Sequence, residues 1–332
     1  MWSVAQGYRI DAMIASLKAA GEATRLRVLA LLGQAELSVK DLTTILGQSQ
    51  PRISRHLKLL ADAGLIDRYP EGAWVFYRLT DSGSGARLAR DLLALTDHDD
   101  PVLSRDRDRL AAIKRDHAAA AHRYFAENAG EWDSIRALHV AEDRVEATVL
   151  KAVGSRHFGS LLDLGTGTGR MLELLAPLCD RAVGIDASPN MLAVARANLD
   201  RAGVGNAQVR LGDIYNLPVP RDSADLVTVH QVLHFLDAPE RALAEAARVL
   251  RPGGRMVIVD FAPHDLEFLR EQHAHRRLGF GEEHVRQWIE VCGLSFDRAV
   301  DLPGQRNKLK VTMWLAHDPR LLVAGSTKRE LA

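Results

Sequence analysis

The chain has 332 residues, and because one domain usually takes roughly 100–200 residues, we expect about two domains. Charged residues make up 26% and apolar residues 47% of the chain, values typical of globular proteins that argue against a disordered, fibrous or coiled-coil chain. The 43 Lys and Arg residues balance the 43 Asp and Glu residues, which excludes a uniformly basic nucleic-acid coat. Any DNA binding must therefore come from a local patch.

The cysteine count and the hydropathy pattern indicate the cellular compartment of the protein. Cys179 and Cys292 are too few for a disulfide framework and suit a reducing cytosol. No apolar run approaches the roughly 18 residues of a membrane span, and Arg9, Asp11 and Lys18 interrupt the N-terminal segment. We therefore expect a cytoplasmic protein with neither a membrane span nor a signal peptide.

The chain changes character near residue 100. Residues 97–108 form a charged stretch with one proline, which is typical of a linker or a frayed helix end. Short helical patterns and one hairpin precede this stretch, whereas strand-like runs that alternate with helical patterns follow it, as in a parallel α/β sheet. We predict a first domain over 1–97, a linker over 98–114, a second domain over 115–318 and a tail over 319–332.

Two short helices joined by a turn are predicted near the middle of the first domain. Ser38 can cap a helix that ends at Gly47, and Pro51 fits the first turn of the next helix. The second helix has an apolar face at spacing i, i+4 and i+7, formed by Ile53, Leu57 and Leu60. Its polar and basic residues off that face are Arg52, Ser54, Arg55, His56 and Lys58. This arrangement is typical of a helix-turn-helix.

A hairpin is predicted over residues 66–79, with its turn at 70–72. A helix-turn-helix followed by a hairpin is a winged helix, whose second helix can reach base edges while a wing cation such as Arg68 reaches phosphates. A charge run on a helix is more often only a solvated surface, and Ser54 and His56 could be capping or packing residues. Both alternatives stay open.

The first domain resembles the ArsR/SmtB family of winged-helix transcription regulators over about residues 10–95. The matching segments are Ala23–Leu29, Ser49–Leu60, Ala63–Ile66 and Gly72–Leu79. The resemblance implies a homodimer that reads a palindromic operator in double-stranded DNA, because protein and operator share a two-fold axis. It implies a DNA-binding role for Ser49, Gln50, Arg52, Ser54, Arg55, His56, Lys58 and Arg68.

The thiolates of the family's metal sensors are missing. Many of these sensors carry a Cys-x-Cys-type pair where this chain has Ser38 and Lys40, and the first cysteine of the chain is Cys179. A soft-metal thiolate site in the first domain is therefore excluded. Residues 82–96 also lack the His and acid spacing of the family's zinc site. We predict no metal in this protein.

A glycine-rich turn follows the first predicted strand of the second domain. Leu161–Leu164 precedes Gly165-Thr166-Gly167-Thr168-Gly169, and such glycines let a backbone approach a ligand closely. Arg170 breaks the Gly-x-Gly-x-x-Gly fingerprint of nicotinamide-binding proteins. Asp186 lies 21 residues after Gly165, at the end of the second predicted strand, where an acid can bind ribose hydroxyls.

Further strands continue this alternation. A third strand leads to Asp213, whose carboxylate can accept a hydrogen bond from an adenine amino group, and a fourth ends at His230. The five predicted strand cores are 161–164, 182–185, 207–210, 226–229 and 256–259. The pattern indicates an α/β domain whose ligand lies beyond the carboxyl ends of the strands.

The second domain resembles the class I S-adenosylmethionine-dependent methyltransferases over about residues 115–317. Further matches are Asp186–Ala195 and Val249–Gly254. The resemblance implies a Rossmann-like, seven-stranded sheet with a reversed last strand, for which 309–315 is our candidate. It also implies that Asp163 and the turn hold the methionine part, Asp186 the ribose, and Asp213 with Ile214 the adenine. The full implied cofactor-binding set is Asp163, Gly165, Thr166, Gly167, Gly169, Asp186, Ala187, Met191, Asp213, Ile214 and His230.

Catalytic residues are harder to assign than binding residues. A hydroxyl or amine acceptor usually needs a base, and His230, Gln231 and His234 follow the fourth strand, where a base could stand. We take His230 and His234 as catalytic candidates, while a structural role for either histidine stays open. The histidines of segment 264–284 could form a lid or bind a metal, and we favour the lid. Residues 118–132, with Tyr124, Phe125 and Trp132, resemble the N-terminal cap of small-molecule methyltransferases.

Two functions from different classes follow. In the first, the chain is a transcription regulator whose second domain senses S-adenosylmethionine or S-adenosylhomocysteine, since fusions of these two families resemble regulators of the methionine and S-adenosylmethionine cycle. In the second, it is an active methyltransferase on a small molecule, and its DNA-binding domain controls its own pathway. A metalloregulator is disfavoured because the thiolates are absent.

Overall fold

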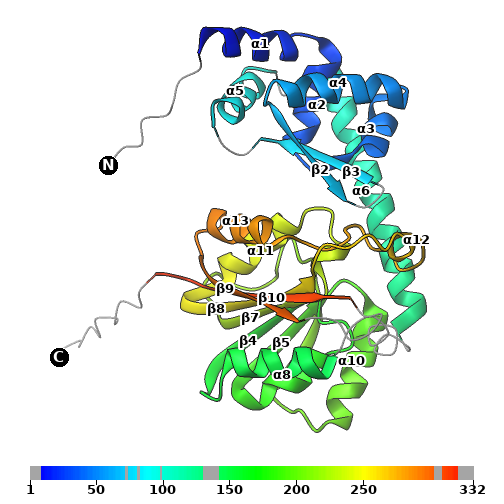
Figure 1. Ribbon diagram of the computed structural model, residues 1–332. Coiled ribbons are helices and arrows are strands. Elements are labelled where there is room, and N and C mark those ends of the chain that lie inside the picture. The colour runs from blue at the N-terminus through cyan, green and yellow to red at the C-terminus, as the bar shows by residue number, and fades with distance from the viewer. Residues whose placement is uncertain are drawn as a thin grey trace, which may run out of the picture. The chain divides into compact units, whose positions relative to one another are not determined.

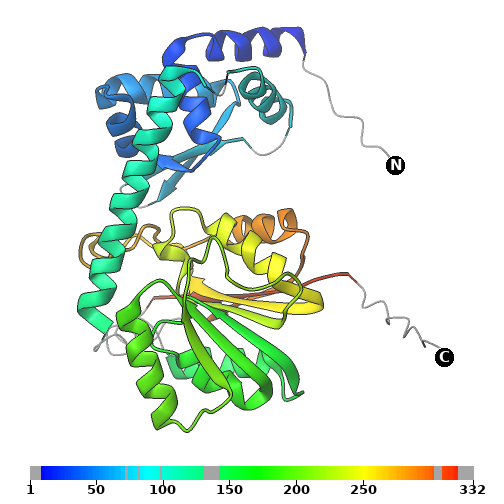
Figure 2. The ribbon, with the colours of Figure 1, turned by 180° about the vertical axis from the view of Figure 1, so that it is seen from behind.

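The computed structural model describes residues 9–71, 74–80, 83–97, 99–129, 142–302 and 309–320. It divides the chain into two compact units, which Figures 1 and 2 show from opposite sides. The first unit comprises Met1–Ala120 with Asp265–Glu267, and the second comprises Ala121–His264 with Phe268–Ala332. No helix in these described ranges is both long enough and apolar enough to cross a membrane.

The first unit is a winged helix, as the sequence predicts. A three-stranded antiparallel sheet has the order β1-β3-β2, in which β2 and β3 form the predicted hairpin. Residues 72 and 73 of the hairpin turn lie outside the described residues. Strand β1 is an addition that the sequence did not indicate. The elements are α1 (Ile10–Ala20), α2 (Ala23–Leu32), β1 (Leu37–Ser38), α3 (Val39–Leu46), α4 (Gln50–Asp62), β2 (Ile66–Glu71), β3 (Trp74–Leu79) and α5 (Gly83–Ala94).

The two helices of the helix-turn-helix form where the sequence places them. Ser38 caps α3 in a capping box with Asp41, in which each side chain bonds the other residue's backbone N–H. Gly47 ends α3 with φ of 63°, a left-handed conformation that suits glycine. The predicted apolar face of α4 is fully buried in the core of the unit: Ile53, Leu57 and Leu60.

Most of the predicted linker is helical in the structure. Helix α6 (Pro101–Asn128) covers most of residues 98–114 and continues into the second unit. Asp100 caps it by accepting hydrogen bonds from the backbone N–H groups of Val102 and Leu103. Leu110 joins the apolar core of the first unit. The charged residues of this stretch therefore begin and anchor a helix, and the boundary between the units falls at residue 120.

The second unit contains a seven-stranded sheet with the order β6-β5-β4-β7-β8-β10-β9. Strand β10 runs antiparallel to both of its neighbours, which confirms the reversed strand predicted near 309–315. The five predicted strand cores all lie within β4 to β8. The strands are β4 (Phe158–Leu164), β5 (Cys179–Asp186), β6 (Ala207–Leu211), β7 (Ala224–His230), β8 (Leu250–Phe261), β9 (Ser295–Leu302) and β10 (Val311–His317).

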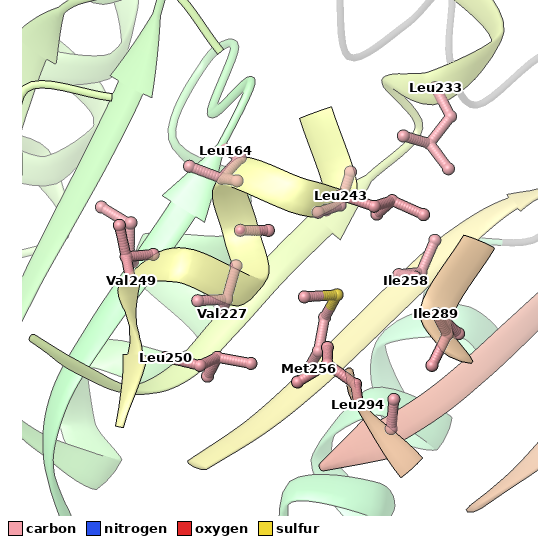
Figure 3. Packing of buried hydrophobic residues seen from close by; sticks show 14 of the residues in the cluster. Leu164, Val227, Leu233, Leu243, Val249, Leu250, Met256, Ile258, Ile289 and Leu294 are labelled. Carbon is pink, nitrogen blue, oxygen red and sulfur yellow. The ribbon is translucent and has the colours of Figure 1, made fainter. Parts of the chain in front are cut away.

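Two apolar clusters cover the two faces of this sheet. Side chains alternate along a strand, so Leu162 and Leu164 join one cluster while Leu161 joins the other. Figure 3 shows part of the first cluster, in which Leu243 and Ile289 pack near Ile258. Helices α11 (Pro239–Val249) and α13 (Glu282–Val291) complete this cluster, and α8 (Glu142–Val153) and α9 (Arg170–Leu175) complete the other.

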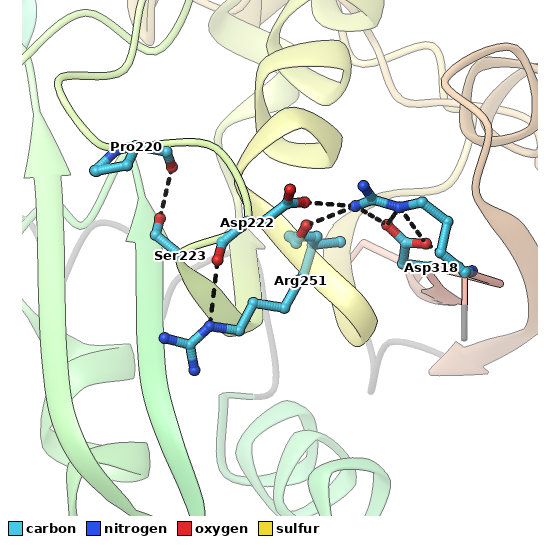
Figure 4. Close-up of polar contacts among 7 residues, drawn as sticks. Pro220, Asp222, Ser223, Arg251 and Asp318 are labelled. Carbon is cyan, nitrogen blue, oxygen red and sulfur yellow. Dashed lines mark hydrogen bonds and ion pairs between the residues drawn. The ribbon is translucent and has the colours of Figure 1, made fainter. Parts of the chain in front are cut away.

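A polar cluster ties the chain together at the amino ends of β7 and β8 (Figure 4). Arg320 donates to the carboxylates of Asp222 and Asp318, in each case at 2.6 Å, and to the carbonyl of Leu250. Arg251 donates to the backbone carbonyl of Asp222. This cluster lies at the edge of the sheet opposite the carboxyl ends of the strands, so it anchors the fold away from the predicted ligand site.

Candidate functional site

The outer face of α4 carries the basic residues predicted to contact DNA. Arg52, Ser54, Arg55 and Lys58 are all exposed, and Ser49 and Gln50 are exposed at the N-terminal end of the helix. The buried apolar stripe fixes the helix orientation, so these side chains share the opposite surface. The geometry therefore permits the predicted major-groove contacts, while the contacts themselves stay a prediction.

His56 differs from its neighbours because it is half-buried. Its Nδ1 lies 3.6 Å from the carboxylate of Glu22. Burial lowers the pKa of His56, the nearby Arg25, Arg52 and Arg55 lower it further, and Glu22 opposes them. At neutral pH His56 is therefore mainly an uncharged hydrogen-bonding group, which is closer to the packing alternative than to a phosphate-binding cation.

The wing presents Arg68 on its exposed side. Arg68 lies on β2 directly opposite Tyr77 on β3, and β3 also carries Arg78, which pairs with Glu36 at 3.5 Å. Thr80 donates to Asp67 and closes the base of the hairpin. These contacts hold the strand that carries Arg68, as a wing cation requires.

The glycine turn after β4 is built from left-handed backbone conformations. Gly165, Gly167 and Gly169 all have positive φ, at 67°, 53° and 85°. A methyl group built on Gly165 would come within 2.5 Å of the side chain of Val232. The loops after β4 and β7 are therefore in close contact at the carboxyl edge of the sheet.

Asp186 lies at the centre of this edge. Its Oδ2 accepts a hydrogen bond of 2.9 Å from the backbone N–H of Gly167, and its Oδ1 accepts one of 2.8 Å from Ser188. Each carboxylate oxygen has a second lone pair, and Asp186 is only half-buried. The carboxylate is thus held in place by the turn and lies partly exposed at the carboxyl edge of the sheet.

Asp163 lies deeper than Asp186. It is 2% exposed and accepts a 2.6 Å hydrogen bond from the hydroxyl of Thr228 on the neighbouring strand β7. The sequence could not place this pair, because 65 residues separate the two side chains. Asp163 lies in β4, two residues before the turn, and its direct contact with a methionine part stays a prediction.

Helix α10 (Pro189–Arg201) begins beside Asp186. Ser188 caps it by accepting from the N–H of Met191, whose side chain is buried, while Ala187 is exposed. Asn198 donates to the carbonyl of Thr168 and ties α10 to the glycine turn. Sequence reasoning missed Asn198, which gave no signal beyond its position on a predicted helix.

The predicted adenine residues follow β6. Asp213 is exposed, and its Oδ1 accepts from the backbone N–H of Tyr215, which closes a tight turn. Ile214 packs against the apolar core. The hydroxyl of Tyr215 accepts from the N–H of Ala238, and burial raises its pKa to about 12. The turn is thus fixed to the next loop, and Asp213 remains accessible.

The two candidate catalytic histidines have different environments. His230 is half-buried at the end of β7. His234 is 2% exposed, and its Nδ1 lies 2.7 Å from Oδ1 of Asp260, which is itself fully buried. This buried pair favours the structural alternative for His234. Of the two histidines, His230 is the one that is partly exposed.

The histidine-rich segment folds back on His234. The backbone N–H groups of Arg276 and Arg277 both donate to the carbonyl of His234, and Arg276 pairs with Asp237. The ring of His275 lies 4.2 Å from that of His234. Within the described ranges, no three His, Cys, Asp or Glu side chains are grouped to hold a metal ion. These contacts hold the segment against the loop after β7, and its role as a lid stays a prediction.

The predicted N-terminal cap is described only in part. Phe125 packs edge-on against Phe235 at 4.7 Å, which places the end of α6 beside the loop after β7. Trp132 and the side chain of Tyr124 lie outside the described residues.

Comparison with known proteins gives two family matches. Residues 22–68 match the bacterial regulatory proteins of the arsR family, and residues 162–258 match the methyltransferase domain. The first match spans α2 to β2, including α4. The second spans β4 to β8, including the glycine turn and Asp186.

Individual relatives are similar to the second unit. An uncharacterized methyltransferase of Bacillus subtilis, YcgJ, is 31% identical over 42% of this chain and 55% of its own length. The arsenite methyltransferase of Halobacterium salinarum is 36% identical over 30% of this chain and 27% of its own length. The chain thus spans about half of the first relative and about a quarter of the second. The crystal structure of YcgJ has a TM-score of 0.46 at 20% identity, covering 53% of this chain and 98% of that one.

Proposed function

We propose that the chain is a cytosolic DNA-binding regulator controlled by S-adenosylmethionine or S-adenosylhomocysteine. The premise is that an ArsR-family helix-turn-helix segment is followed in this chain by a match to the methyltransferase domain. The observation that carries this proposal is the hydrogen bond from Gly167 to Asp186, which joins a glycine turn to an accessible carboxylate. The genes it controls would belong to the methionine and S-adenosylmethionine cycle, as the resemblance to such fusions implies.

The residues at the carboxyl edge fit such a nucleoside. The glycines give the turn the positive φ angles that bring the N–H of Gly167 to Asp186, and Asp186 would accept hydrogen bonds from ribose hydroxyls. Asp213 would accept from the adenine amino group, and Ile214 would contact the ring. His230 would face the methyl acceptor. Bound S-adenosylmethionine supplies an already activated methyl group on its sulfonium.

The proposed DNA-binding form is a homodimer on a palindromic operator. Helix α1 displays an exposed apolar stripe at helical spacing: Ile10, Met13, Ile14 and Leu17. A large exposed apolar patch marks an interaction surface in a soluble protein, and a second copy would cover it symmetrically. Each copy would then present Arg52, Arg55 and Lys58 to one half-site.

Coupling between the two sites would use α6. Its first half contributes Asp106 and Leu110 to the first unit, and its last turns contribute Phe125 and the carbonyl of Ala126 to contacts in the second. Asn190, which donates to Ala126, lies four residues after Asp186. If α6 has two states, a nucleoside that binds more tightly to one of them would shift the protein toward that state. The affinity for DNA could change by at most the ratio of the nucleoside's affinities for the two states.

An active methyltransferase is the second candidate. The match over residues 162–258 and the relatives named as methyltransferases favour it. In this case His230 would be the candidate base for a small-molecule acceptor. The two candidates share the same nucleoside site. They differ in methyl turnover and in whether the bound nucleoside changes the affinity for DNA.

One experiment tests both candidates. Duplexes that bind the protein are selected from random sequences, and the affinity for the selected duplex is measured with S-adenosylmethionine, S-adenosylhomocysteine or neither. Regulation requires that nucleoside and DNA change each other's affinity by the same factor. Absence of any mutual effect would reject the regulator, and methyl release measured in the same samples decides on the enzyme.

A further inference from the structure

Gln231 combines two unusual features at the predicted ligand edge. It has a φ of 59°, although it is not a glycine, and such strained residues concentrate at functional sites. Gln231 is only 6% exposed, yet its side-chain Nε2 has no hydrogen-bond partner among the described residues. An unsatisfied buried amide is costly, so its retention needs an explanation.

The position of Gln231 supplies that explanation. In the parallel pair of β4 and β7, Leu164 is opposite Val229, so the glycine turn and Gln231 leave the sheet side by side. The sheet order reverses between these two strands, and ligands of such folds bind where the order reverses. The side chain of Val232, the next residue, occupies the space that a Cβ on Gly165 would need, at 2.5 Å from it. Gln231 therefore belongs to the loop that lines the proposed nucleoside site.

A ligand with an amino-acid part needs hydrogen-bond donors for its carboxylate. Most backbone N–H groups of the glycine turn already donate to acceptors within the protein. The N–H groups of Gly165 and Thr166 donate to the carbonyl of Ile185, and that of Gly169 donates to Thr166. The N–H of Gly167 donates to Asp186. These four backbone donors are therefore satisfied within the protein.

The nearest guanidinium in the sequence is also engaged. Arg170 makes a bidentate pair with Glu146, through two hydrogen bonds of 2.7 Å, and a third bond with Glu173. A carboxylate bound at the turn would have to compete with two protein carboxylates for this side chain. A neutral donor that lacks a hydrogen-bond partner within the described part of the chain is better suited to bind this carboxylate.

We propose that the side-chain amide of Gln231 donates a hydrogen bond to the carboxylate of the amino-acid part of the nucleoside bound at the glycine turn. This inference rests on the proposed function and adds a binding residue to it. A hydrogen bond to a charged group contributes about 1.5–3 kcal/mol, so its loss corresponds to roughly ten- to a hundred-fold in affinity.

The test compares two ligands that differ only in this carboxylate: S-adenosylmethionine and its decarboxylated form. Calorimetric affinities are measured for the wild type, Gln231→Ala and Gln231→Glu, with Gln208→Glu as the matched control on exposed β6. We expect Gln231→Ala to lose about ten- to a hundred-fold for S-adenosylmethionine and to change by less than about two-fold for the decarboxylated ligand. Gln208→Glu should bind both ligands as the wild type does.

The Gln231→Glu variant keeps the proposal testable if the smaller side chain disturbs the loop. Its negative charge should weaken binding of S-adenosylmethionine further, while binding of the decarboxylated cation is kept or improved. Equal losses for both ligands, or no loss for S-adenosylmethionine, would overturn the role of Gln231 and leave the proposed function standing. A wild-type protein that binds neither ligand would overturn the proposed function and this inference together.

Discussion

Arg27 on α2 donates two hydrogen bonds to the carboxylate of Asp106 on α6, at 2.6 Å from Nε and 2.7 Å from Nη2. This ion pair anchors the charged stretch near residue 100 to the first unit. The hydrogen bonds to Asp106 raise the pKa of Arg27, which remains charged at every relevant pH.

Removing Arg27 should destabilise the first unit strongly. Asp106 is 2% exposed, so Arg27→Ala leaves a buried carboxylate without its cation, and breaking such a pair costs about 3–5 kcal/mol. Hydrogen exchange of α2 and α3 amides under native conditions measures this loss. The control is Arg87→Ala, whose exposed pair with Asp91 is worth under about 0.5 kcal/mol. Equal effects of the two variants would contradict the importance of the buried pair.

The exposed cations of α4 should control DNA binding. Arg52→Ala and Arg55→Ala should each weaken operator binding, and a variant that loses a phosphate contact should reduce the salt slope by about 1. Fluorescence anisotropy at several salt concentrations measures both quantities. Arg90→Ala on α5, which is also exposed, provides the matched control. Unchanged affinity in both α4 variants would remove α4 from the interface.

The environment of His56 predicts a pH dependence of stability. Burial lowers the pKa of His56 in the folded chain below its usual value of about 6.5. As the pH falls through 6.5, the unfolded chain binds a proton that the folded chain does not, so the stability of the first unit decreases. Urea unfolding at pH 7.5 and 5.5 should show this decrease, and His56→Gln should reduce it. If His157→Gln, an exposed histidine of the second unit, gave the same reduction, the effect would not belong to His56.

Two glycines with the same φ separate backbone strain from steric contact. Gly165 and Gly203 have φ of 67° and 68°, but a methyl group would collide with Val232 only at Gly165. Gly203→Ala should cost about 1 kcal/mol, and Gly165→Ala should cost about 1–3 kcal/mol more and abolish nucleoside binding. Thermal unfolding and calorimetry measure the two effects. Equal destabilisation would show that the close contact between the loops is unimportant.

The sequence predicted the local features of the fold well. The cap at Ser38, the left-handed Gly47 and the apolar face of α4 depend on neighbouring residues, and each appears in the structure. The glycine turn and Asp186 are adjacent because parallel strands end at one edge of a sheet. Predicting that these two segments lie together therefore requires only the order of the strands in the sheet.

Features that depend on distant partners were missed or left open. Strand β1 has two residues and exists because Leu37 pairs with Tyr77, and β9 lacks a continuous apolar run because it lies at the sheet edge. The pairing of His234 with Asp260 spans 26 residues and has no signature in spacing. The strained backbone of Gln231 likewise follows from packing between two loops.

Calorimetric titration of the full-length protein with S-adenosylhomocysteine tests the central claim most directly. We predict saturable binding of one nucleoside per chain in the wild type. Asp186→Ala should abolish it, because the carboxylate held by Gly167 is lost, while Asp200→Ala on the exposed side of α10 should leave it unchanged. The absence of heat and of any thermal shift in the wild type, or full binding by Asp186→Ala, would contradict the account.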